Sequence, residues 1–210
     1  LTEDGLPTFI NQDGQKTISS FNFQEYEKLD FLKYEGPTDP TITGSFGNIL
    51  TYKNLKLNVF VTYSFGNVIR LDPVFSNAYS DLDAMPKEFK NRWMKAGDEN
   101  VTNIPTIVST RMNQQYAYLN MAYNAYNYSD VRIADGGFIR LKEISLSYDL
   151  PAKVINFFRL NKLQLKLQAT NLCLLYADSK LNGQDPEFFR SGGVSTPVPK
   201  QFTFTVRLGL

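Results

Sequence analysis

Five stretches of the chain have the pattern of β-strands. Four of them alternate apolar and polar residues with a period of two, as in a strand with one apolar face, and the fifth, residues 41–52, is a Gly-containing stretch. The most regular stretches cover residues 163–170 and 202–210. The other three cover residues 41–52, 55–65 and 138–150. All ten prolines lie outside these stretches, as expected if their backbone N–H groups bond within a sheet. The sequence therefore predicts five strands.

Three local features refine these strands. The polar pair Lys53-Asn54 separates two of the stretches and predicts a tight hairpin turn. Phe60 is an apolar exception on the polar side of its strand. The apolar positions change phase between Leu141 and Ile144, which predicts a β-bulge near Lys142.

Short and long connections alternate between the stretches. Lys53-Asn54 and residues 151–161 are short, whereas residues 70–137 and 177–199 are long. In an antiparallel meander, this order puts all short turns at one end and all long loops at the other, as in outer-membrane β-barrels. A soluble β-sandwich, which buries its apolar face in a core, explains the alternation within each strand equally well. As a barrel the chain would be incomplete, because five strands leave two open edges.

Two short helices are expected between the strands. Pro86 suits a first helical turn, Phe89 and Trp93 are four residues apart, and Gly97 suits the position after a helix end. Together they predict a helix from about Pro86 to Ala96. Residues 154–158 indicate a brief apolar helical turn. The first forty residues are rich in turn-forming Gly and Pro and are expected to be loop.

Composition excludes several classes of function. The 210 residues carry 22 basic and 21 acidic side chains, so the net charge of +1 does not favour binding to nucleic acid. The absence of histidine and the single cysteine exclude His-dependent catalysis, the usual zinc ligands and an internal disulfide. A glycosidase needs only two carboxylates, but no acidic pair stands out. We therefore expect no enzyme, and no catalytic residue, metal site or cofactor.

The start of the sequence leaves two alternatives for the origin of the chain. No run of about 18 apolar residues predicts a transmembrane helix. Residues 1–5 lack the basic start and apolar centre of a signal peptide, and the chain begins without Met. Either an export signal has been removed or the chain is an inner segment of a longer protein.

Several segments along the chain carry a family resemblance. They are YEGPTDPTITG at 34–44, TYKNLKL at 51–57, YSFGN at 63–67, DGGFIRLKEISLSYDLP at 135–151, Asn171-Leu172 with Asp185-Pro186-Glu187, and residues 197–210. In this order they resemble the C-terminal barrel region of the SusC/RagA family. Members of that family are TonB-dependent outer-membrane transporters of Gram-negative bacteria.

The resemblance implies an all-β fold, namely the last five antiparallel strands of a 22-stranded transmembrane β-barrel with long extracellular loops that contain a short helix. Residues 1–40 would form an extracellular loop, residues 41–69 a hairpin, residues 70–137 a long extracellular loop, and residues 138–210 the final three strands. The plug domain of the family would lie outside this chain.

The implied function is TonB-dependent import of a nutrient, an oligosaccharide or a peptide, across the outer membrane. Implied partners are the plug and other strands of the same transporter, a SusD-like lipoprotein, TonB through the missing N-terminal part, and outer-membrane lipid. Nucleic acid is not among them. The alternative function is that of a soluble β-sandwich carbohydrate-binding module.

A tyrosine-rich segment is the candidate for contact with a ligand or with the lipoprotein lid. Aromatic rings among amide side chains suit contact with sugar rings or peptide backbones. They are also typical of protein interfaces and loop packing, and we favour loop packing or lid contact over direct ligand contact. The candidate residues are Tyr116, Tyr118, Tyr123, Tyr126 and Tyr128.

Other polar residues have simpler interpretations. Asp81 and Asp83 are weak calcium candidates and suit the approach to a helix better. One set of residues would face the barrel interior, where it forms a solvated wall or contacts the plug. This set is Lys56, Glu143, Gln164, Lys166, Gln168 and Arg207.

Overall fold

The computed structural model describes residues 1–11, 13–19, 31–74, 85–157, 160–189 and 197–209. The chain forms two compact units. The first, called the loop unit here, comprises Leu1–Glu35 and Arg70–Ala134, and the second, called the sheet unit, comprises Gly36–Ile69 and Asp135–Leu210. Among the described residues, no helix is long and apolar enough to cross a membrane.

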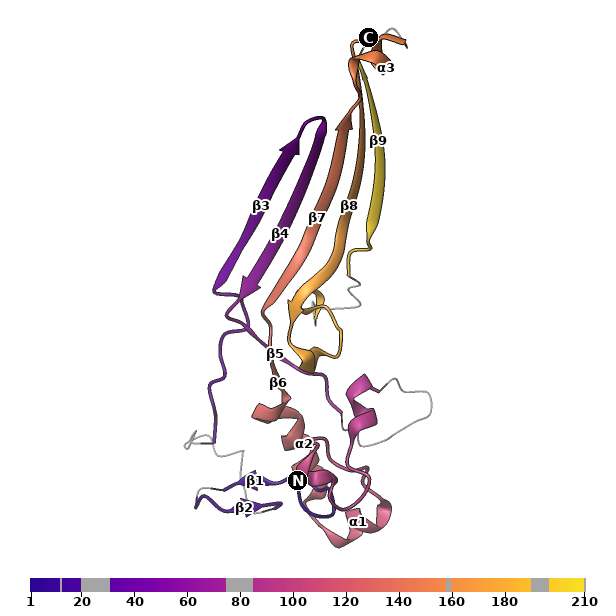
Figure 1. Ribbon diagram of the computed structural model, residues 1–210. Helices are drawn as coiled ribbons and strands as arrows, with labels where there is room; N and C mark the ends of the chain where they lie inside the picture. The colour runs from indigo at the N-terminus through magenta and orange to yellow at the C-terminus, as the bar shows by residue number, and fades with distance from the viewer. Residues whose placement is uncertain (12, 20–30, 75–84, 158–159, 190–196, 210) are drawn as a thin grey trace. The chain divides into compact units, whose positions relative to one another are not determined.

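An antiparallel sheet of five strands makes up most of the sheet unit, in the order β3, β4, β7, β8, β9 (Figure 1). Each of the five predicted stretches matches one of these strands to within about one residue, except that β8 continues past the predicted end. The strands are β3 (Ile42–Tyr52), β4 (Leu55–Phe65), β7 (Phe138–Asp149), β8 (Lys162–Ala177) and β9 (Gln201–Gly209).

Four short strands have no counterpart in the prediction. β1 (Phe9–Ile10) pairs with β2 (Lys16–Thr17), and β5 (Val68–Arg70) pairs with β6 (Ile133–Asp135). The expectation that the first forty residues are loop is therefore wrong at β1 and β2. The Asn11 side chain accepts hydrogen bonds from the backbone N–H groups of Asp13 and Gln15, which closes the turn between these two strands.

The hairpin between β3 and β4 is confirmed. Tyr52 pairs with Leu55 across the two-residue turn, and Lys53 has a φ of 52°, as the tight turns of hairpins require. Phe60, the apolar exception of β4, pairs with Gly47. A Cβ at Gly47 would lie 3.0 Å from the Phe60 ring, so glycine makes room for this side chain.

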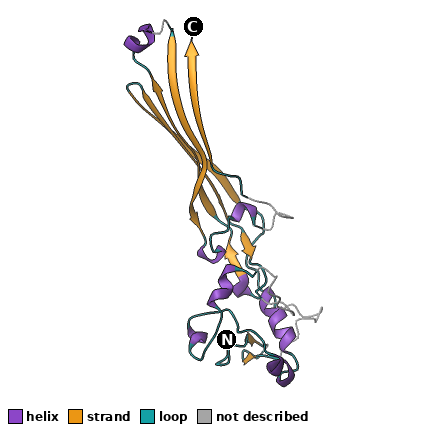
Figure 2. Ribbon diagram, turned by 90° about the vertical axis from the view of Figure 1, so that its right-hand side faces the viewer, coloured by secondary structure: helices purple, strands orange, loops and turns teal. Residues whose placement is uncertain are grey.

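A line of irregular pairing crosses three strands and confirms the predicted bulge. Against β4, Lys142 is an extra residue, because the register shifts between Phe60 and Val61. Against β8, Asn171 and Leu172 together lie opposite Lys142. Asn171 has a φ of 53°, which Asn tolerates better than most residues. Figure 2 shows the strands bending and twisting along their length, as bulges promote.

The two ends of the sheet have different connections (Figure 1). The β3–β4 turn and helix α3 (Ala152–Phe157), which links β7 to β8, lie at one end. Helix α3 covers residues 154–157 of the predicted apolar turn. The last residue of that prediction, 158, lies outside the described residues. The other end carries the β8–β9 connection, with two 3-10 helices, η4 (Ser179–Leu181) and η5 (Pro186–Phe188).

The loop unit contains short helices around two small apolar clusters. The helices are η1 (Lys87–Asn91), η2 (Asp98–Asn100), α1 (Thr110–Gln115), α2 (Leu119–Tyr128) and η3 (Asp130–Arg132). One cluster contains Leu6, Leu119 and Tyr123. The other is built around Val74, Ile104 and Tyr126.

The helix predicted from Pro86 to Ala96 is wrong in length and type. Only the 3-10 helix η1 forms, and Arg92 after it is extended. The Trp93 N–H donates to the Ile104 carbonyl. The Asp98 carboxylate accepts the backbone N–H groups of Met94 and Lys95. These contacts take the donors that a longer helix would need.

Trp93 packs against the N-terminal segment. A Cβ at Gly5 would lie 2.6 Å from Trp93 Cγ, and Gly5 has a φ of +75°. The Gly5 carbonyl also accepts a hydrogen bond from the Thr106 N–H at 3.0 Å. The first residues are therefore built into the loop unit through a contact that only glycine permits.

We predict that Gly5→Ala destabilises the loop unit by about 3 kcal/mol, the sum of backbone strain and overpacking against Trp93. Gly14→Ala is the matched control, since Gly14 has the same φ and no atom within 4 Å of its would-be Cβ. That change should cost only about 1 kcal/mol of strain. Hydrogen exchange of α2 amides in the complete protein measures the difference, and equal effects of the two changes would contradict the packing role of Gly5.

Candidate functional site

The two faces of the five-stranded sheet differ in polarity. Cross-strand pairs place the apolar residues of all five strands on one side, called the apolar face here. Among the described paired residues of this face, none is Asp, Glu, Lys or Arg. Many of its large side chains are exposed, namely Ile42, Phe46, Leu50, Tyr52, Leu146, Tyr148, Leu167, Phe202, Phe204, Val206 and Leu208.

Aromatic side chains border the apolar face at both ends. Tyr52 and Tyr148 lie at the end with the β3–β4 turn. At the other end, the Phe65 ring centroid is 6.0 Å from that of Tyr63 and 6.2 Å from that of Tyr176. The 11 residues of β4 run from one row to the other. At a rise of about 3.3 Å per residue this is about 33 Å, or a height of about 25 Å for a strand tilted by about 40°.

The opposite side of the sheet, called the polar face here, contains all six residues predicted to face inward. Several of them contact one another or their neighbours. The Glu143 carboxylate accepts a hydrogen bond from Asn58 at 3.2 Å and lies 3.9 Å from the Lys166 ammonium. Gln164 bonds to Asp149 at 2.9 Å. This hydrogen-bonded surface is suited to contact with water.

Two of the five candidate tyrosines lie inside the loop unit. Tyr123 and Tyr126 are 1% and 4% exposed, and the Tyr123 hydroxyl donates to the Thr106 carbonyl at 2.7 Å. They belong to helix α2, whose buried positions follow the helical i, i+3, i+4, i+7 spacing: Leu119, Ala122, Tyr123 and Tyr126. That spacing is the signal by which the sequence could have revealed the helix.

The other three tyrosines lie at the surface. Tyr116 is partly buried against the cluster of Leu6 and Leu119. Tyr118 is 58% exposed and Tyr128 is 68% exposed. The Arg70 guanidinium lies 5.7 Å from the Tyr128 ring centroid, which is a cation–π distance.

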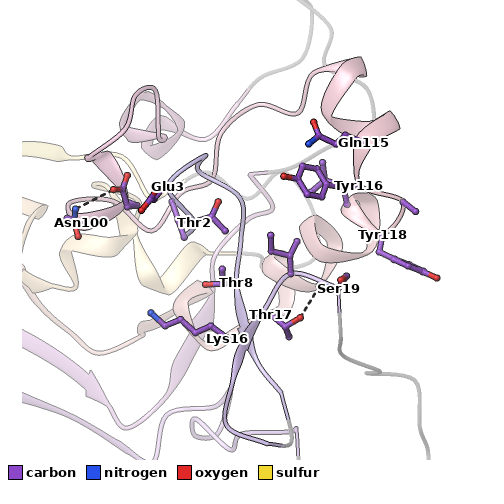
Figure 3. Close-up of a pocket in the computed structure, with 15 residues that line it drawn as sticks. Thr2, Glu3, Thr8, Lys16, Thr17, Ser19, Asn100, Gln115, Tyr116 and Tyr118 are labelled. Atoms are coloured by element: carbon purple, nitrogen blue, oxygen red, sulfur yellow. Dashed lines mark hydrogen bonds between the residues drawn. The ribbon is translucent and has the colours of Figure 1, made fainter.

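Tyr116 and Tyr118 line an open pocket in the loop unit, with a volume of about 950 Å³ (Figure 3). The N-terminal segment, β2, η2 and the α1–α2 junction all contribute to it. Its wall offers hydroxyl, amide and charged groups, among them Thr8, Gln115 and Lys16. Glu99 also lines it, and a hydrogen bond from its own backbone N–H and one from Trp93 lower the pKa of its carboxyl. The pocket is suited to a polar ligand with one flat surface.

A buried ion pair lies beside Tyr126, in the apolar cluster of Val74 and Ile104. The Arg132 side chain is 2% exposed and donates to the Glu88 carboxylate and the Asp72 carbonyl, both at 2.5 Å. Burial alone would lower the pKa of Arg132, but the hydrogen bond to Glu88 and the neighbouring charges raise it overall. Burial raises the pKa of Tyr126, beside this guanidinium, to about 12. The cluster holds η1 and η3 together.

Another ion-pair cluster lies in the sheet unit. Arg140, on the polar face, pairs with Asp185 at 2.5 Å and with Glu187 at 3.1 Å. The Arg140 side chain is only 8% exposed. Sequence reasoning did not assign these three residues to a site, because a separation of 45 residues gives no local signal.

The remaining candidates are Asp81, Asp83 and Cys173. Asp81 and Asp83 lie outside the described residues. Within the residues that the structure describes, no group of three or more Cys, His, Asp or Glu side chains is arranged to hold a metal ion. Cys173 is exposed and pairs with Leu141 on the apolar face.

We predict that the stability of the loop unit falls as pH rises from about 10 to about 12. An unfolded tyrosine loses its proton near pH 10, whereas folded Tyr126 keeps its proton up to about pH 12, so alkali favours the unfolded state. A shift of about two units corresponds to roughly 3 kcal/mol. In Tyr126→Phe, this part of the pH dependence should vanish. Unfolding curves of parent and variant across this window measure it, and identical curves would contradict the burial of a neutral Tyr126.

The chain is similar to one curated protein and to several solved structures. No family model matches the sequence. The chain is 26% identical over 186 residues to TonB-dependent receptor P3 of Formosa agariphila, a match that covers 89% of this chain and 16% of the receptor. The chain thus spans only a small part of this relative.

Solved structures of RagAB share the fold. The structure of the RagAB peptide importer in the open-open state matches with a TM-score of 0.62 and 20% identity, over 98% of this chain and 21% of that one. The RagAB peptide transporter matches with a TM-score of 0.63 and 21% identity, over the same shares. The resemblance to SusC/RagA-type TonB-dependent transporters, inferred from the sequence, is therefore confirmed.

Proposed function

We propose that the chain forms part of the barrel wall and outer loops of a TonB-dependent transporter that imports a nutrient across the outer membrane of a Gram-negative bacterium. In this proposal its five long strands are the last five of a 22-stranded barrel. Residues 1–40 and 70–137 form extracellular loops, and residues 41–69 and 138–210 contribute the strands.

The apolar face carries this proposal. This face, whose described paired residues include no charged side chain, is about 25 Å high and bordered by aromatic rows. It has the dimensions and composition of a lipid-facing barrel wall. The polar face opposite is suited to a water-filled interior. In a sandwich, a second layer would cover the apolar face, whereas the described part of the sheet unit contains a single large sheet whose apolar side chains are exposed.

Nutrient capture would involve the loop unit. Tyr116, Tyr118 and Tyr128 lie at its surface, whereas Tyr123 and Tyr126 are buried in its two apolar clusters. The pocket beside Tyr116 and Tyr118 has polar groups for an oligosaccharide or a peptide. A SusD-like lipoprotein lid would cover this side, and TonB would act through the N-terminal part of the transporter. No step in this function requires catalysis.

We predict that arginine substitutions at two adjacent residues of β4 differ in their effect on stability. Val59 lies on the apolar face near the middle of the strand, so Val59→Arg would place a guanidinium in lipid. This change should lower the free energy of unfolding of the complete transporter by about 2 to 4 kcal/mol. Asn58→Arg is the matched control, because position 58 lies on the polar face beside Glu143 and can accept a positive charge.

Urea unfolding of the complete transporter in lipid vesicles measures both changes. If Val59→Arg is tolerated as well as Asn58→Arg, the apolar face does not meet lipid. Recovery of the native protein in a soluble extract without detergent would contradict the membrane location directly and favour a binding module.

We predict that Tyr118→Ala weakens capture of the nutrient or docking of the lid about tenfold, which corresponds to about 1.4 kcal/mol. Tyr34→Ala is the control, because Tyr34 is also exposed, at 83%, but lies outside the pocket wall. Binding of fluorescent oligosaccharide and peptide libraries, and of the purified lipoprotein, to the complete transporter gives the readout. Equal binding by both variants would remove Tyr118 from the proposed contact surface.

A further inference from the structure

The first part of the β8–β9 connection, residues 178–188, has its own internal hydrogen bonds. The Asp178 carboxylate accepts the Lys180 N–H and caps η4, and the Asp185 carboxylate accepts the Glu187 N–H and caps η5. Asn182 adopts a φ of 53° between the two helices. Leu181 and Pro186 are buried. Residues 178–188 therefore hold one shape.

Two contacts fix this element to the sheet. The second Asp178 carboxylate oxygen accepts the Asp135 N–H at 2.8 Å, just before β7 begins. Arg140 of β7 pairs with Asp185 and Glu187. Both anchors lie at the start of β7, so the element lies against that end of the strand (Figure 1, where it is the gold segment at the end of β8).

The register decides which side of the sheet the element covers. Arg140 pairs with Thr62 of β4, and Thr62 shares the polar face with Asn58. The Arg140 side chain is 8% exposed because the ion pairs with Asp185 and Glu187 cover it. Residues 178–188 thus fold over the polar face and not over the apolar face.

We infer that residues 178–188 form a fixed constriction inside the mouth of the barrel and that Arg140 is its positioning residue. This inference rests on the proposed function, since the polar face is the interior of the barrel only in that proposal. The constriction narrows the passage by its own bulk, and it remains in place because releasing Arg140 would leave a buried guanidinium without its carboxylates.

The test compares thiol labelling from outside intact cells that express the complete transporter. Ser179→Cys, in a background with Cys173→Ser, places a reporter on the exposed side of the element. A small maleimide should label it readily, whereas a maleimide coupled to a long polyethylene glycol chain should react at least tenfold more slowly. Arg140→Met, which removes the charge and keeps much of the side-chain volume, should remove most of that difference.

Two controls separate this outcome from simple unfolding. Val101→Cys, an 84% exposed position in the loop unit, should label equally fast with and without Arg140→Met. Glu187→Gln, which removes only one of the two ion pairs, should give an intermediate rate and is the variant to use if Arg140→Met does not fold.

Two results overturn the inference. If the large reagent labels Ser179→Cys as fast as the small one in the parent, the element does not lie within the mouth. If Arg140→Met changes neither rate, Arg140 does not position it. Failure of the proposed function itself is seen separately, as tolerance of Val59→Arg in lipid vesicles.

Discussion

The structure depends on the requirement that each face of the sheet, and each backbone polar group at its edges, finds a suitable environment. Within the described chain, β3 and β9 each pair on one side only. Open edges beside an apolar face are costly in water, where they promote aggregation, and more costly in lipid, where nothing replaces the missing hydrogen bonds. Both problems disappear when further strands continue the sheet into a closed wall.

This requirement explains why the strands could be predicted from the sequence. Where the two faces of a strand differ in polarity, every second residue is of the same kind. This period of two is clear in β4, β7, β8 and β9, whereas Asn48 on the apolar face and Ile49 on the polar face interrupt it in β3. The same regularity exposes its exceptions. The phase change near Lys142 could be assigned to a bulge because Ile139 and Leu141 before it are out of phase with the alternating residues 144–150 after it. Phe60 differs from Asn58 and Thr62, its polar neighbours on the same face.

The loop unit and the site could not be predicted in the same way, because their contacts join residues far apart in the chain. The Trp93 N–H donates to the Ile104 carbonyl, and this bond prevents η1 from continuing. Arg140 pairs with Asp185, which is 45 residues away in the sequence. The tyrosine-rich segment shows the limit most clearly. Tyr118 and Tyr123 have the same chemistry and differ only in position. Tyr118, at the start of α2, is exposed, whereas Tyr123, within α2, is buried.

Charged residues are distributed differently on the apolar face and in the loops. The paired residues of the apolar face that the structure describes carry no charge. Arg132 in the loop unit and Arg140 in the sheet unit are nearly buried, and each connects distant segments through carboxylates. An arginine can do this because its planar guanidinium bonds several acceptors at once and stays charged. Loops without a large apolar core of their own thereby gain fixed shapes, and in the proposed transporter these loops would form the surfaces that meet a ligand.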